Sequence, residues 1–163
     1  MPTRDLRLLR DQLAERKVNV EKYVPAETLA VHARVVEQLR QSGMVERSAH
    51  AGRKAPEFTL NDHDGKPVAL STLLERGRLI LCFFRGRWDP FCCAQMEAMN
   101  EFLSYYERTG ALLVGISPQT VRHSYFMREQ HHLRFPLLSD AGNEVARQFG
   151  IVYRYLASSP QPV

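Results

Sequence analysis

The stretch R-L-I-L-C-F-F-R-G-R-W-D-P-F-C-C, residues 78 to 93, joins an apolar run to the start of a helix. The run at 78–84 is continuous rather than alternating, which predicts a central strand that is covered on both faces. Asp89 suits an N-cap and Pro90 suits the first helical position, so we expect a helix from Pro90 to about Arg108. In α/β sheets, ligands bind beyond the carboxyl ends of the strands, so we expect the chemistry of this protein at the turn between this strand and the helix.

Strands and helices alternate on both sides of this stretch. The predicted helix that follows Asp89 turns five apolar side chains inward, at Met96, Met99, Phe102, Leu103 and Tyr106. The other expected elements are a hairpin at 57–70 with an Asp-Gly turn, helices at 71–77, 118–132 and 143–149, and strands at 111–117, 135–140 and 151–155. This alternation predicts an α/β fold with a largely parallel sheet and right-handed crossovers.

Two amphipathic helices are expected ahead of this domain. Residues 5–16 carry leucines at 6, 9 and 13, the stripe of one helix. A second helix is predicted from Pro25 to Ser42, with a buried side formed by Leu29, Val35, Val36 and Leu39. We therefore expect a helical N-terminal extension at 1–49, an α/β domain at 50–156 and a tail at 157–163.

The composition is that of a globular domain. The 163 residues are 44% apolar and 25% charged, and no apolar run approaches the ~20 residues that span a bilayer. The first residues lack the apolar centre of a signal peptide, so we predict a cytoplasmic protein with no membrane partner. The net charge of +4 is spread among interleaved acidic and basic residues, and no recognition motif accompanies it, so no nucleic-acid partner is expected.

The cysteine count argues against a disulfide scaffold. The three cysteines are Cys82, Cys92 and Cys93, an odd number, and two of them are neighbours. A metal site is not expected either, because His131 and His132 are adjacent and would point about 100° apart on a helix. No bound cofactor is predicted.

Local chemistry leaves two interpretations of Asp89 and Cys92 open. A thiol in the first turn of a helix has its thiolate stabilised, so Cys92 is a candidate reactive group, with Arg85 adding positive charge nearby. Alternatively, Asp89 is an ordinary helix cap and the cysteines are small apolar fillers. Cys82, in the apolar run, is expected in the core, and the role of Cys93 stays open.

The motifs taken together resemble a known family. K-A-P-E-F-T-L-N-D-H-D-G-K-P-V-A-L, L-I-L-C-F-F-R-G-R-W-D-P-F-C and F-P-L-L-S-D-A-G-N-E-V-A-R-Q-F-G are similar, in order, to the peroxiredoxin-like branch of the alkyl hydroperoxide reductase / thiol-specific antioxidant (AhpC/TSA) family. The resemblance covers residues 50 to about 154. It implies a thioredoxin-like, three-layer α/β/α fold.

The resemblance also assigns roles within the opening stretch. The motif of that branch reads R-G-x-W-C-P-x-C, and its first cysteine is the peroxidatic residue, which peroxide oxidises to a sulfenic acid. That position is Asp89 in this sequence, Arg85 and Gly86 match the R-G pair, and Cys92 matches the second cysteine, which could resolve the sulfenic acid. A carboxylate cannot form a sulfenic acid, and its charge would raise the pKa of the Cys92 thiol.

The family function implied is a thiol peroxidase that takes a hydroperoxide and a thiol reductant such as thioredoxin. With Asp89 in place of the thiol, peroxide turnover by this chain is expected to be impaired. The alternatives are a redox-dead scaffold, and a variant or fragment of an active peroxidase in which Asp89 mimics an oxidised cysteine.

The end of the sequence also departs from the family pattern. Members of the family usually continue after the F-G-I-V-Y region with a strand pair and a final helix, whereas only A-S-S-P-Q-P-V follows Leu156 here. A domain truncated at this point would expose an apolar edge and face. We therefore expect a homo-oligomer in which another subunit covers that face.

Overall fold

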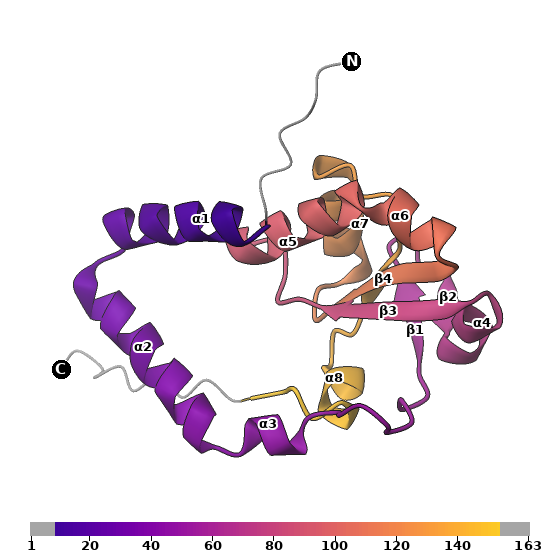
Figure 1. Cartoon of the computed structure of the whole chain (residues 1–163), viewed down its shortest axis with the longest axis horizontal. Coiled ribbons are helices and arrows are strands. Elements are labelled where there is room, and N and C mark those ends of the chain that lie inside the picture. Colours follow the sequence, from indigo (N-terminus) through magenta and orange to yellow (C-terminus); the bar gives the residue numbers. More distant parts are fainter. Residues whose placement is uncertain (1–8, 154–163) are drawn as a thin grey trace.

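The computed structural model describes residues 9–153, which form a sheet covered by helices on both faces (Figure 1). Its five strands lie in the order β2-β1-β5-β4-β3. β3, β4 and β5 are parallel, and β1 is antiparallel to β2 and β5. The strands are β1 Thr59–Asp62, β2 Pro67–Ala69, β3 Arg78–Phe83, β4 Ala111–Ser117 and β5 Leu137–Ser139. The α/β class is confirmed.

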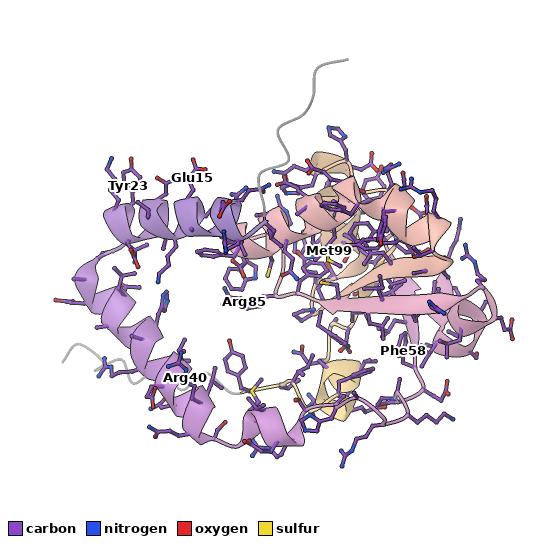
Figure 2. The ribbon with its side chains drawn as sticks, in the orientation of Figure 1. Glu15, Tyr23, Arg40, Phe58, Arg85 and Met99 are labelled. Atoms are coloured by element: carbon purple, nitrogen blue, oxygen red, sulfur yellow. The ribbon has the colours of Figure 1, made fainter. Side chains whose placement is uncertain are left out.

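Alternating side chains divide the core into two clusters, one on each face of the sheet. Leu113 packs beneath α5 (Pro90–Glu101), α6 (Leu103–Arg108) and α7 (Val121–Gln130). Val114, the next residue of β4, packs toward α4 (Leu70–Glu75) and α8 (Glu144–Gln148). Figure 2 shows Met99 and Phe58 on these two opposite faces. The three predicted layers are therefore present.

The apolar run at 78–84 forms β3, and this strand lies at a different place in the sheet from the one predicted. β3 pairs with β4 alone among the described strands and forms an edge of the sheet. Its side chains still reach both core clusters, Cys82 on one face and Leu81 on the other. The prediction of a central strand was wrong because burial on both faces requires helices above and below a strand, not a neighbouring strand on each side.

The long helix predicted from Pro90 to Arg108 is broken at Phe102. This residue has φ −89° and ψ 3°, and it separates α5 from α6. The main-chain carbonyl of Asn100 accepts a hydrogen bond from the Arg134 guanidinium at 3.2 Å. The side-chain Oδ1 of Asn100 accepts a second one from the main-chain amide of Arg134 at 2.8 Å. These bonds accompany the break, which brings Leu103 into the core and leaves Phe102 exposed rather than inward.

The N-terminal helices are α1 (Leu9–Tyr23), α2 (Ala26–Gln41) and α3 (Met44–Arg47). The first of them does not end near residue 16 as predicted but continues to Tyr23. α1 lies against α5, where Arg16 and Glu97 form an ion pair at 3.7 Å, and α2 extends away from the sheet (Figure 1). On α2, the expected stripe is only half-buried, and Val36 is exposed rather than buried.

The chain after α3 returns to the end of α8. The Ala49 amide donates to the carbonyl of Phe149 at 2.9 Å. Gly150 has φ +71°, and a Cβ there would lie 2.3 Å from the Arg47 carbonyl oxygen. Only glycine combines this left-handed conformation with so close a backbone approach. The two segments that flank the sheet therefore meet at Gly150.

Some predicted elements extend beyond the described residues. The start of the first helix, residues 154–156 and the tail at 157–163 lie outside them, and residues 151–153 form no strand. The other bounds differ from the predictions by a few residues, for instance because Thr120 caps α7. Between residues 9 and 153, the helices are too short or too polar to span a bilayer.

Candidate active site

The turn between β3 and α5 places Asp89 at the start of the helix. Its Oδ1 accepts a hydrogen bond from the Phe91 amide at 3.0 Å, which is the predicted N-cap bond, and Pro90 occupies the first helical position. Only 2% of Asp89 is exposed, so the carboxylate is a buried charge. A buried carboxylate is tolerated only where partners replace its water.

Arg85 is the main partner of this carboxylate. Its Nε and Nη2 lie 2.8 and 2.7 Å from Oδ2 of Asp89, so both donors converge on one oxygen. The guanidinium also lies over the Trp88 ring, 4.8 Å from the ring centroid. The sequence made Arg85 a candidate site residue, as added positive charge and as part of the R-G pair, and in the structure it is the counter-ion of Asp89.

Cys92 lies one turn into α5 and shares the same carboxylate oxygen. Its Sγ donates to Oδ2 of Asp89 at 2.9 Å and accepts from the Arg85 amide at 3.4 Å. Burial, followed by the hydrogen bond to Asp89, raises the pKa of the Cys92 thiol. The stabilisation expected from the helix N-terminus is therefore outweighed, and Cys92 is a protonated thiol near neutral pH.

Asp89 has the opposite shift. Burial opposes its ionisation, but the hydrogen bonds from Cys92, Arg85 and the Phe91 amide, together with the charge of Arg85, outweigh burial and lower its pKa. Asp89 is therefore an anion at neutral pH. The Arg85, Asp89 and Cys92 side chains form one charge-balanced cluster in which a thiol proton is held between sulfur and carboxylate.

The other two cysteines have hydrogen-bond partners outside this cluster. Cys93 is buried, and its Sγ donates to the carbonyl of Arg87 at 3.4 Å; burial, followed by the charge of Glu97, raises its pKa. Cys82 lies in the core as predicted, and burial raises its pKa to about 11. All three cysteines are free thiols.

Gln119 is a neighbour of the site that the sequence analysis missed. Its Oε1 accepts a hydrogen bond from the Arg87 amide at 2.8 Å, so it fixes the turn that leads to Asp89. The sequence did contain a signal for Gln119, because this residue lies just after the end of the predicted strand at 111–117. Parallel strands end at the same edge of a sheet, so a residue there lies near the turn that follows residues 78–84.

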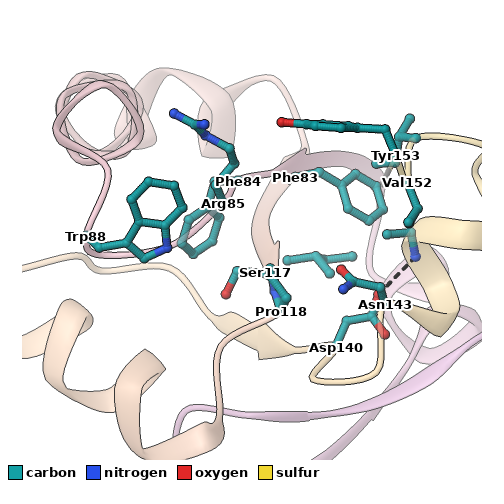
Figure 3. A pocket seen from close by; sticks show the side chains of 13 residues that line it. Phe83, Phe84, Arg85, Trp88, Ser117, Pro118, Asp140, Asn143, Val152 and Tyr153 are labelled. Atoms are coloured by element: carbon teal, nitrogen blue, oxygen red, sulfur yellow. Dashed lines mark hydrogen bonds between the residues drawn. The ribbon is translucent and has the colours of Figure 1, made fainter. Parts of the chain in front are cut away.

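A cavity of about 430 Å³ lies beside the cluster, beyond the carboxyl ends of the parallel strands (Figure 3). Arg85 and Trp88 form one wall, and Val152 and Tyr153 form the opposite one. Phe83, Phe84, Ile116 and Ala146 contribute apolar surface. Neither Asp89 nor Cys92 is among the lining residues, whereas Arg85, the counter-ion of Asp89, is one of them.

No group of three or more histidine, cysteine or acidic side chains in residues 9–153 is arranged to hold a metal ion. His131 instead pairs with Glu97, with 2.8 Å between Nδ1 and Oε1.

The lowered pKa of Asp89 predicts a loss of stability in acid. The folded-state pKa lies below the unfolded value of about 3.9, so the ionised carboxylate stabilises the fold above that value. This contribution should disappear as the pH falls through the folded pKa. Urea unfolding measured between about pH 6 and pH 2.5 should show a steeper acid decline for the unaltered chain than for Asp89→Asn. Equal declines would contradict the prediction.

Comparison with known proteins finds peroxiredoxins among the relatives of this chain. The model of the AhpC/TSA family matches residues 51–161. Peroxiredoxin Q of wheat, a chloroplastic protein, is 31% identical over 128 residues, which cover 78% of this chain and 58% of the wheat protein. Peroxiredoxin Q of Arabidopsis thaliana, also chloroplastic, is 30% identical over 109 residues, 67% of this chain and 50% of that protein. This chain thus spans about half the length of these relatives.

Solved structures agree with the family match. The crystal structure of peroxidoxin BcpB from Mycobacterium tuberculosis is 35% identical, with a TM-score of 0.61, and the match covers 65% of this chain and 68% of that one. Peroxiredoxin Q from Xanthomonas campestris, at 23% identity and a TM-score of 0.55 over 59% of this chain and 60% of that one, supports the fold alone. The predicted thioredoxin-like fold is confirmed.

Proposed function

This chain belongs to the AhpC/TSA family and is a homologue of thiol peroxidases, and on that premise we propose that Asp89 occupies its peroxidatic position. The supporting observation is the convergence of three donors on Oδ2 of Asp89, two from Arg85 and one from Cys92. A carboxylate held in this way is nearer in charge and shape to a sulfinate, the over-oxidised form of a cysteine, than to a thiol.

The consequence for peroxide chemistry is that Cys92 is the remaining candidate thiol. In the reaction we propose, the Cys92 thiolate attacks the peroxide O–O bond, the sulfur becomes a sulfenic acid, and the leaving oxygen departs as water or an alcohol after taking a proton. A thiol reductant such as thioredoxin then displaces hydroxide to form a mixed disulfide, which a second thiol of the reductant reduces. The raised pKa of Cys92 makes the first step slow.

A second candidate function has its own support. The Arg85–Asp89 pair neutralises the charge at the peroxidatic position and engages the Cys92 proton, which favours a redox-silent protein that keeps the fold of a peroxidase. In that case Asp89 holds the site permanently in a form like the oxidised state. The two candidates differ in whether Cys92 reacts at all.

The assembly of the protein is also a proposal. We propose that residues 1–49 form a helical extension and that residues 50–156 form the thioredoxin-like peroxiredoxin domain. In this proposal, the extension makes the contacts between copies of the chain. Support comes from α2, whose apolar side chains Leu29, Val35 and Leu39 are only half-buried. The proposed partners are therefore a hydroperoxide, a thiol reductant and a second copy of the chain.

Peroxide consumption with excess dithiothreitol tests the role of Cys92. The unaltered chain should consume hydrogen peroxide slowly, and Cys92→Ser should be at least about tenfold slower because the thiolate is the nucleophile. Cys82→Ala is the matched control, since this thiol lies in the core, and Cys93→Ser measures any contribution from the adjacent thiol. An undiminished rate in Cys92→Ser would exclude Cys92 chemistry, and no consumption by the unaltered chain would favour the redox-silent protein.

A further inference from the structure

The side chain of Gln119 is fixed at both of its polar ends. It is 8% exposed. Its Oε1 accepts from the Arg87 amide at 2.8 Å, while its Nε2 donates to Oγ of Ser117 at 3.2 Å and lies 3.8 Å from Sδ of Met127. A buried amide with both ends engaged has one orientation, because a flip would place its NH₂ against the Arg87 N–H.

The main chain of Gln119 is tied to the sheet as well. Its carbonyl accepts a hydrogen bond from Oγ of Ser139, which is the last residue of β5. Ser117 is the last residue of β4. Gln119 therefore connects the ends of two parallel strands to the turn that follows the third, β3.

The turn itself packs on the stem of this side chain. Gly86 has φ +145°, and a Cβ there would lie 3.4 Å from Cγ of Gln119 and 2.9 Å from Nε1 of Trp88. The turn is closed by a hydrogen bond from the Asp89 amide to the Gly86 carbonyl at 3.2 Å. Its position depends on Gln119 on one side and on the start of α5 on the other.

The same turn presents main-chain donors to the sulfur of Cys92. The Arg85 amide lies 3.4 Å from Sγ, and hydrogen bonds from the amides of Arg85 and Gly86 lower the pKa of the thiol. The titratable groups that face this sulfur are Asp89, which raises its pKa, the Arg85 guanidinium, and the thiol of Cys82. The amides thus oppose Asp89, and they do so only while the turn keeps its place.

We infer that Gln119 is a positioning residue for the Cys92 thiol: through Arg87 it holds the turn so that the Arg85 and Gly86 amides face the sulfur. Gln119 does not touch the sulfur. The inference rests on the proposed function only in treating Cys92 as the thiol of interest, and its test uses no peroxide, so the two can fail separately.

The test is the pH profile of Cys92 alkylation by iodoacetamide, followed by tryptic digestion and mass spectrometry. The parent carries Cys93→Ala, and cleavage at Arg85 and Arg87 separates Cys82 from Cys92. Gln119→Met keeps the apolar volume but removes the acceptor for the Arg87 amide. It should slow alkylation near pH 8 about threefold, because losing donors to the thiolate moves its titration upward by about half a pH unit.

Ser117→Ala is the matched control. It removes a partner of the same amide but leaves the bond between Gln119 and Arg87, so its profile should stay close to that of the parent. If Gln119→Met unfolds, as judged by its thermal transition, Gln119→Asn serves instead, because its shorter side chain cannot reach Arg87. The inference is overturned if the profile of the folded variant equals that of the parent, if Ser117→Ala shifts it equally, or if neither variant at 119 folds, since Gln119 is then only structural.

Discussion

Asp89→Cys is expected to consume peroxide faster than the unaltered chain by on the order of a hundredfold or more, since a missing nucleophile costs enzymes several orders of magnitude. The new thiol would stand at the N-cap of α5, where the helix dipole and Arg85 favour its thiolate. The charge that opposes ionisation of Cys92 would be gone, and the two thiols would lie within one turn of each other. The measurement is peroxide consumption with thioredoxin and its reductase.

Asp89→Ser is the control that separates the effect of the new thiol in Asp89→Cys from the effect of removing the carboxylate. Serine matches cysteine in size, accepts a capping hydrogen bond and removes the carboxylate, yet it cannot be oxidised by peroxide. Its rate should rise only as far as loss of the carboxylate lowers the pKa of Cys92, and it should stay well below that of Asp89→Cys. If Asp89→Cys folds and is no faster than Asp89→Ser, position 89 is not the peroxidatic position and the proposed function is wrong.

Asp89→Ala is expected to lower the free energy of unfolding at pH 7 by about 2–3 kcal/mol. It removes the capping bond to the Phe91 amide and the partner of Arg85, and it leaves the Cys92 thiol without its acceptor. Since half of the Arg85 side chain is exposed, the ion pair itself contributes only part of this loss. Urea unfolding measures the difference.

Asp89→Asn is the control for the charge. Its side-chain oxygen can still accept from the Phe91 amide, so the cap is kept while the ion pair is lost. Its cost should be clearly smaller than that of Asp89→Ala. Equal costs would mean that the charge, and not the cap, accounts for the stability that Asp89 provides.

The sequence predicted the order of the elements because each signal was local. The Asp-Pro pair that begins α5 acts within a single turn, and the structure shows the expected bond from Asp89 to Phe91. The alternation of strands and helices then implied a parallel sheet, and three strands are parallel. What the sequence did not reveal was the position of β3 at the edge, since pairing depends on strands far apart in the chain.

The chemistry of the site depends on longer-range contacts in the same way. The sequence offered two opposing effects on Cys92, a helix N-terminus and a nearby carboxylate, and no way to rank them. The structure ranks them, because burial of the sulfur and its hydrogen bond to Asp89 act together. Gln119 was missed because it reaches the turn from a strand end 32 residues later in the chain than Arg87.

The backbone contact at Gly150 links two parts of the molecule that lie far apart in the sequence. The residues that directly follow it, Ile151 to Tyr153, line the cavity, while the residues that it contacts end the N-terminal helices. A protein that binds α2 and shifts it would displace α3, and through Arg47 it would move the wall formed by Val152 and Tyr153. Binding of another molecule to the N-terminal helices would thereby change the cavity wall that lies opposite Arg85.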